Sequence, residues 1–226
     1  MLDNIKIIFF HIEKSMGSSI RLILENYFKN IFNINEIYTP SKFNNINLIT
    51  FSNYKFINNL PNDFKVLLCH IPYKNNLTNI LCNNIFSITC IRNPYNRIIS
   101  HYYYFDYPKY KKYLYELNND DIINILNNYG NLTFKRLGPI NKITEINCIL
   151  IMENIKNDII NLNEILNAKY NKNIKLKLKN VNSNNKYSLS IQFDIIFLEK
   201  YTNYFKEDID IYNFVSSLPL NKRFKL

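Results

Sequence analysis

The stretch that most restricts the fold is residues 7–20, IIFFHIEKSMGSSI, because it joins a short apolar run, a tight loop and the start of a helix. The apolar run at its beginning is β-prone and too short to span a bilayer, so it predicts a buried central strand. Gly17 follows, and the apolar positions after it form one face of a helix that Ser18 or Ser19 could cap. The stretch therefore predicts a strand-loop-helix unit.

The loop of this unit contains the groups that bind an anion. The amides at the helix start, the hydroxyls of Ser18 and Ser19 and the ammonium of Lys14 would all face one point. The spacing differs from the G-x-x-x-x-G-K-[ST] pattern of a nucleoside-triphosphate loop. An ordinary strand-to-helix connection can carry the same residue types, so both interpretations stand on this stretch alone.

Further apolar runs predict three more strands and a helix after most of them. The strands are expected at residues 66–69, 86–91 and 148–152, and the helices at 94–102, 120–129, 155–166 and 191–205. Strands that alternate with helices favour an α/β fold, with three layers (α/β/α) around a mainly parallel sheet. The length of 226 residues fits a single domain over residues 1–226.

Three segments are less regular. Residues 31–64 predict only short strands or turns. Residues 102–117 are rich in Tyr and Lys, and favour a Tyr-packed helix with a solvated Lys face over a nucleic-acid platform. Residues 169–190 are basic and Asn-rich and predict a mobile surface loop.

Polar residues follow directly after two of the predicted strands. His70 follows the strand at 66–69, and Arg92 follows the strand at 86–91. In an open parallel sheet, ligands bind at the carboxyl ends of the strands. We therefore expect His70 and the loop after residue 10 to open onto one crevice.

The composition limits the partner and the compartment. A formal net charge of +10 suggests an anionic partner, which could be nucleic acid, a nucleotide, an acidic glycan or a membrane surface. The four cysteines form no C-x-x-C pair, which favours a reducing compartment. No run is long enough for a transmembrane helix, and the N-terminus lacks the features of a signal peptide, so we expect a cytoplasmic or otherwise soluble protein.

Two separated segments resemble one family. FFHIEKSMGSS resembles the phosphosulfate-binding loop of sulfotransferases that use 3′-phosphoadenosine 5′-phosphosulfate (PAPS), whose carbohydrate-directed branch commonly reads F-x-H-I-P-K-T-G-G-T-S. FSITCIRNPYNRIISHYYYF resembles their 3′-phosphate-binding segment, a strand followed by R-[DN]-P-x-x-R-x-x-S-x-[YF]. Weaker similarity extends to ILIMENI, like a late strand of the family, and to VNSNNKYSLS, like its C-terminal Asn-Ser loop. The resemblance implies a P-loop-like sulfotransferase fold.

The first motif implies roles for four residues of the loop. By this resemblance Lys14 contacts the sulfate and the bridging phosphate oxygen, and Gly17, Ser18 and Ser19 bind the 5′-phosphate. The chemistry agrees, because sulfuryl transfer leaves charge on the departing phosphate oxygen and a fixed ammonium stabilises that charge.

The second motif implies a site for the 3′-phosphate. Arg92 and Ser100 match the pair that holds it, one by charge-assisted hydrogen bonds and the other by its hydroxyl. Arg97 could assist, or it could form a salt bridge across the helix surface. Ser183 and Lys186 match the late loop of the family and are carried over as cofactor contacts.

A base must take the proton of the acceptor hydroxyl, and imidazole has a suitable pKa near neutral pH. His70 resembles the catalytic histidine of the hexuronic-acid 2-O-sulfotransferase branch, which also follows a strand between the two cofactor motifs. His11 lies within the loop motif and is expected to shape it. His101 follows Ser100 and is expected to pack or to face solvent.

The sequence thus predicts a sulfotransferase that transfers a sulfuryl group from PAPS to a hydroxyl. The expected acceptor is a carbohydrate, and an acidic glycan would fit the positive charge. The product is 3′-phosphoadenosine 5′-phosphate (PAP), and no metal, nucleic acid or membrane anchor is expected. Two residues depart from the family pattern: Glu13 stands where Pro is usual, and Met16 where the first Gly is usual. They motivate the alternative, a non-catalytic nucleotide- or nucleic-acid-binding protein that retains the fold.

Overall fold

A computed structural model describes residues 6–31, 37–38, 66–69, 85–177 and 188–225. Within these residues five strands form one sheet in the order β2-β3-β1-β4-β5, and every pair of neighbouring strands is parallel. The strands are β1 (Lys6–Phe10), β2 (Ile37–Tyr38), β3 (Val66–Cys69), β4 (Ile85–Ile91) and β5 (Cys148–Ile151). The predicted α/β class and parallel sheet are confirmed.

The helices of the described residues alternate with the strands and then accumulate after β5. They are α1 (Gly17–Lys29), α3 (Pro94–His101), α4 (Tyr107–Tyr110), α5 (Asn119–Tyr129), α6 (Leu132–Leu137), α7 (Ile140–Ile143), α8 (Ile155–Tyr170), α9 (Ser188–Leu198), α10 (Lys206–Ser217) and α11 (Leu220–Arg223). A π-helix, η4 (Tyr102–Asp106), continues α3, and 3-10 turns lie at η5 (Leu114–Glu116), η6 (Met152–Asn154) and η8 (Glu199–Phe205).

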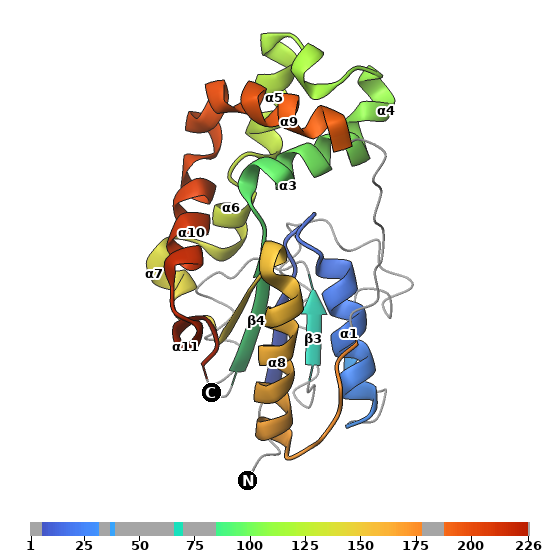
Figure 1. Cartoon of the computed structure of the whole chain (residues 1–226), viewed down its shortest axis with the longest axis vertical. Helices are drawn as coiled ribbons and strands as arrows, with labels where there is room; N and C mark the ends of the chain where they lie inside the picture. The colour runs from blue at the N-terminus through green and yellow to red at the C-terminus, as the bar shows by residue number, and fades with distance from the viewer. Residues whose placement is uncertain (1–5, 32–36, 39–65, 70–84, 178–187, 226) are drawn as a thin grey trace.

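The central strands are buried on both faces, as their near-continuous apolar sequences require. Because successive strand residues point to opposite faces, Ile7 and Phe9 of β1 pack with α1 and α8, whereas Ile8 and Phe10 pack with α6, α7 and α10. Figure 1 shows these two groups of helices on opposite sides of β4. The arrangement fits the predicted three layers.

A separate apolar cluster lies beyond the carboxyl ends of the strands. It joins α3, η4, η5, α5, α9 and η8 through buried residues that include Ile98, Tyr102, Ile125 and Phe205. Figure 1 shows α3, α5 and α9 gathered past the tip of β3. We call these elements the helical cap, and its contacts with the sheet edge determine the surroundings of the candidate site.

Several predicted boundaries need correction. Helix α1 begins at Gly17 with Met16 as its N-cap residue, and no side chain caps it, so neither Ser18 nor Ser19 has the predicted capping role. Gly130 is the C-cap residue of α5, and its φ of −54° is not left-handed. A larger residue does not fit at this position, because a Cβ there would lie 2.4 Å from the carbonyl oxygen of Tyr204.

Two predicted helical regions are interrupted. Residues 102–117 form a π-helix, a short α-helix and a 3-10 turn, because their tyrosines pack into the helical cap from several directions. The predicted helix at 191–205 ends as an α-helix at Leu198 and continues as a 3-10 segment. In the predicted loop at 169–190, α8 extends to Tyr170, and residues 178–187 lie outside the described residues. None of the described helices is long and apolar enough to cross a membrane.

Candidate functional site

Two loops leave the sheet at the same edge and in opposite directions. The loop after β1 leads through α1 toward β2, on one side of the sheet, and the loop after β4 leads through the helical cap to β5 on the other. β1 and β4 are neighbours, with Phe10 paired to Thr89. Such a point of divergence is where open parallel sheets bind ligands. We call residues 11–16, the loop after β1, the edge loop.

One hydrogen bond joins the edge loop to the loop after β4. Nη1 of Arg92 donates to the carbonyl oxygen of Lys14 over 3.0 Å. The two motifs of the sequence analysis, 78 positions apart at these residues, therefore meet at the edge of the sheet.

The backbone of the edge loop is tightly wound. Lys14 and Met16 both have positive φ, 61° and 56°. This left-handed conformation is sparsely populated by residues other than glycine. Gly17 is required for a different reason, since a Cβ at this position would lie 1.6 Å from Cδ2 of His11. His11, which is buried and stacks on Phe9, thus shapes the loop, as expected from its place in the motif.

The start of α1 faces this edge without a cap or an acidic residue in its first turn. Gly17, Ser18 and Ser19 form that turn, in which backbone amides have no acceptor within the helix. Ser18 is exposed and Ser19 is buried. The amides and the helix dipole together make this end favourable for an anion.

The ammonium of Lys14 lies against an aromatic ring of the helical cap. Its Nζ is 3.7 Å from the ring centroid of Tyr104 and 6.0 Å from that of Phe105. Burial, and next the nearby charge of Arg92, lower the pKa of Lys14. Within the described residues its ammonium forms no ion pair.

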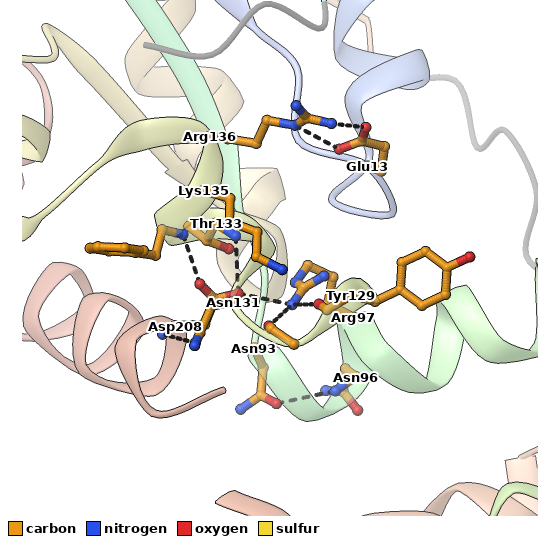
Figure 2. A network of polar contacts seen from close by, with 12 residues as sticks. Glu13, Asn93, Asn96, Arg97, Tyr129, Asn131, Thr133, Lys135, Arg136 and Asp208 are labelled. Atoms are coloured by element: carbon orange, nitrogen blue, oxygen red, sulfur yellow. Dashed lines mark hydrogen bonds and ion pairs between the residues drawn. The ribbon is translucent and has the colours of Figure 1, made fainter. Parts of the chain in front are cut away.

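The acidic residue of the edge loop is paired within the protein. Oε1 of Glu13 accepts from Nη2 of Arg136 over 2.7 Å, and Oε2 accepts from Nε over 3.4 Å (Figure 2). Burial raises the pKa of Glu13, although the charge of Arg136 opposes this shift. The sequence alone does not show where the side chain of Glu13 points. Its partner, Arg136 on α6, lies 123 positions away.

Arg92 retains donor capacity. Its Nε is buried without a hydrogen-bond partner among the described residues. Burial lowers the pKa of Arg92, while the charge of Glu153, in η6 after β5, opposes this effect. Glu153 itself accepts from the amide of Asn93 over 3.1 Å and from the hydroxyl of Tyr212 over 3.3 Å.

The second motif is divided between the edge and the cap. Ser100 lies on α3, and no hydrogen bond joins it to Arg92 in the described part of the chain. Arg97 is fully buried and its Nη2 donates to Asp208 over 2.8 Å and to the carbonyl oxygens of Tyr129 and Gly130 over 2.7 and 2.6 Å. Arg97 thus forms a salt bridge, as one interpretation held, but the bridge is buried and reaches α10 instead of crossing the surface of α3 (Figure 2).

His101 packs, and does not face solvent. Its ring stacks between Phe105 and Tyr129, with centroids 5.5 and 4.6 Å away. Burial, followed by the charges of Arg97 and Lys14, lowers its pKa to about 3. Neither ring nitrogen has a hydrogen-bond partner within the described residues.

Three residues near the edge loop were missed in the sequence. Ser15, whose hydroxyl is fully buried without a described hydrogen-bond partner, lies inside the first motif and was available from that pattern. Arg136 and Tyr104 had no such signal, because only the tertiary structure brings them to the loop.

Three of the predicted site residues, His70, Ser183 and Lys186, lie outside the described residues. The strand before His70 ends at Cys69, which pairs with Phe10 at the end of β1.

Searches of protein-family models, characterised proteins and solved structures find no match to this chain.

Proposed function

We propose that the chain is a sulfotransferase that transfers a sulfuryl group from PAPS to a hydroxyl, and that its sheet and edge loop form a P-loop-like sulfotransferase fold. The observation that carries the proposal is the hydrogen bond from Arg92 to the carbonyl oxygen of Lys14. It joins the two motifs that resemble the phosphosulfate-binding and 3′-phosphate-binding segments of that family. The parallel sheet diverges at the same point, which supports a ligand site there.

The residues at the edge fit an anion with more than one charged group. The start of α1 offers amides, Lys14 offers an ammonium, and Ser15 and Arg92 offer buried polar atoms that have no described hydrogen-bond partner. Buried polar groups are nearly always paired in native proteins, so unpaired ones suggest a missing partner. The pairing of Glu13 with Arg136 also supports the proposal, because it compensates the carboxylate that departs from the family pattern.

In the reaction the acceptor oxygen bonds to the sulfur of PAPS as the bond between that sulfur and the phosphate oxygen breaks. Lys14 and the first amides of α1 would hold the phosphate oxygen on which charge develops, and such fixed donors provide a large part of catalysis in similar reactions. Gly17, Ser18 and Ser19 would bind the 5′-phosphate. Arg92, assisted by Ser100, would hold the 3′-phosphate.

The proton of the acceptor hydroxyl requires a base. We keep His70 in this role, since its strand ends beside β1 at the same edge. His101 is poorly suited, because burial and neighbouring cations hold its pKa at about 3, and His11 packs against Gly17 and Phe9. The acceptor is proposed to be a carbohydrate.

A transfer assay with radiolabelled PAPS and a panel of glycans tests the proposal. We expect labelled product with the wild-type chain, a loss of at least about 100-fold in Lys14→Ala, as for removal of one charge-stabilising donor, and no change in Lys109→Ala. Lys109 is a matched control because it is an exposed lysine that also contacts a tyrosine ring. Equal labelling by wild type and Lys14→Ala contradicts the assigned role of Lys14.

A binding measurement separates the proposal from the non-catalytic alternative. PAP should raise the melting temperature saturably and much more than AMP does, because only PAP offers a 3′-phosphate to Arg92. Polynucleotide binding that weakens steeply with salt, without preference for PAP, would instead support a nucleic-acid-binding protein.

A further inference from the structure

The π-helix η4 places Tyr104 against the side chain of Lys14. It follows α3, the helix that begins two residues after Arg92, without a break. The amide of Tyr107 donates to the carbonyl oxygen of Tyr102, five positions earlier. A π-helical turn of this kind is rare and is frequently found at functional sites. Here it holds Tyr104 with its ring centroid 3.7 Å from Nζ of Lys14.

The rest of Lys14 is already fixed by other contacts. Its backbone has φ 61°, and its carbonyl oxygen accepts from Arg92. The long side chain still has several rotatable bonds, and no described acidic group pairs with its ammonium. The ring of Tyr104, supported at its edge by Phe105 with centroids 4.7 Å apart, is therefore the contact that orients the charge.

A second lysine shows what an incidental contact of this kind looks like. Nζ of Lys109 lies 4.6 Å from the ring centroid of Tyr110, its sequence neighbour, and Lys109 is exposed. The pair at Lys14 differs because its lysine is half-buried, although the ring of Tyr104 is exposed, and because it joins two distant segments of the chain. A cation over an aromatic face gains more when it is shielded from water.

We propose that Tyr104 is a positioning residue that holds the ammonium of Lys14 at the sheet edge, ready for the phosphosulfate group. An ammonium has three N–H donors, so contact with one ring face leaves donors for an anion on the other side. This inference rests on the proposed function for its catalytic meaning. Its geometric part, the contact between Tyr104 and Lys14, is tested separately.

The geometric test uses the full chain with its lysines ¹³C-dimethylated, which preserves their charge. We expect the methyl signal of Lys14, assigned with Lys14→Arg, to be shifted upfield by the ring of Tyr104. The shift should persist in Tyr104→Phe, which retains a ring, and disappear in Tyr104→Leu. Tyr110→Leu is the matched control and should move only the signal of Lys109. An unshifted Lys14 signal in the wild-type chain overturns the inference, whether or not the chain transfers sulfate.

The kinetic test follows sulfate transfer from PAPS. Tyr104→Leu should lower kcat by about 2- to 10-fold, the range expected for loss of a partly exposed cation–π contact. KM for PAPS should change by less than about threefold, because the other phosphate contacts remain, and Tyr104→Phe should restore kcat. Equal kinetics of Tyr104→Leu and wild type overturn the positioning role. Absence of transfer by the wild-type chain contradicts the proposed function and leaves the NMR result to decide the geometry.

Discussion

Arg92 and Arg97 come from the same short segment, yet their charges meet different surroundings. Arg97 is buried against the carboxylate of Asp208, which also accepts from the amides of Thr133 and Phe134. We call this cluster the Arg97 node (Figure 2). Arg92 and Lys14 at the edge loop meet a carbonyl oxygen and an aromatic ring, and neither forms an ion pair within the described residues.

The difference indicates how the two regions divide their work. In the Arg97 node the positive charge is compensated inside the protein, which suits a role in joining α3, α6 and α10. At the edge loop the charge of Arg92 adds to burial in lowering the pKa of Lys14. An anion would relieve the repulsion between these two cations. The absence of an ion pair at Lys14 and Arg92, among the described residues, supports the proposed anion site at the edge loop, whereas the paired charge of Arg97 fits a structural role.

The largest expected effect comes from breaking the Arg97 node. Arg97→Met leaves the carboxylate of Asp208 buried without its cation and should lower the free energy of unfolding by about 3–5 kcal/mol. Urea denaturation measures this. The double variant Arg97→Met/Asp208→Leu removes both charges and should recover much of the loss. If it is less stable than the single variant, the charge pair is not the cause.

His101 lies between the two regions and reports on both. The charges that face it come from Lys14 of the edge loop, Arg92, Arg97 of α3 and Arg136 of α6, and together with burial they lower its pKa from 6.5 to about 3. The folded protein thus keeps His101 neutral, while the unfolded chain binds a proton below pH 6.5. Stability should be lost as the pH falls from about 6.5 to about 3.

The corresponding prediction uses His101→Phe, which keeps an aromatic ring between Phe105 and Tyr129. This variant should gain about 2 kcal/mol over wild type on lowering the pH from 7 to 5, since one fewer group takes up a proton on unfolding. Chemical denaturation at several pH values provides the measurement. Parallel pH profiles of the two proteins would show that folding does not lower the pKa of His101.

Much of the fold, and less of the site, could be predicted from the sequence. The apolar runs of β1, β3, β4 and β5 are local signals, and so is the alternation with helices. The pairs Arg97–Asp208 and Glu13–Arg136 join positions 111 and 123 residues apart, and a single sequence contains no signal for such distances. The same limit explains why the sequence left open whether Arg97 assists at the 3′-phosphate or forms a surface salt bridge, and did not predict its buried partner.

Local departures were also hard to foresee. The motif drew attention to Ser18 and Ser19 as caps, but the left-handed backbone of Met16 starts the helix one residue before Ser18. The π-turn at Tyr102–Asp106 has no recognised sequence pattern in a run of aromatic residues. Both features lie next to Lys14 at the proposed site, and local sequence rules fail most often at functional sites.

A smaller effect on stability is expected for Arg92→Met, in contrast with Arg97→Met. It removes one hydrogen bond, to the carbonyl oxygen of Lys14, and should cost about 1 kcal/mol or less because the repulsion of Lys14 is removed as well. Binding of PAP should fall by at least about tenfold, since a charge-assisted contact is lost. Calorimetry with PAP and with AMP makes the check: an equal loss for both ligands would argue against a contact to the 3′-phosphate.

The smallest expected effect concerns the strain of the edge loop itself. Met16 has φ 56°, which costs about 1–2 kcal/mol for a residue with a Cβ. Met16→Gly removes that cost but adds entropy to the unfolded chain and loses the packing of Met16 against the core, so we expect a change of about 1 kcal/mol or less in the free energy of unfolding. Met16→Ala keeps the strain and loses the packing, and should be the less stable of the two variants.

Lys111→Gly provides the matched control, because Lys111 has φ 54° and is exposed at the end of α4. Both glycine variants relieve a left-handed backbone, but only Met16→Gly does so beside the start of α1. If the edge loop is held in shape for an anion, Met16→Gly should change the affinity for PAP and Lys111→Gly should not. An equal response of PAP binding in the two variants would mean that the strained backbone at Met16 has only a structural role, like the buried charge of Arg97.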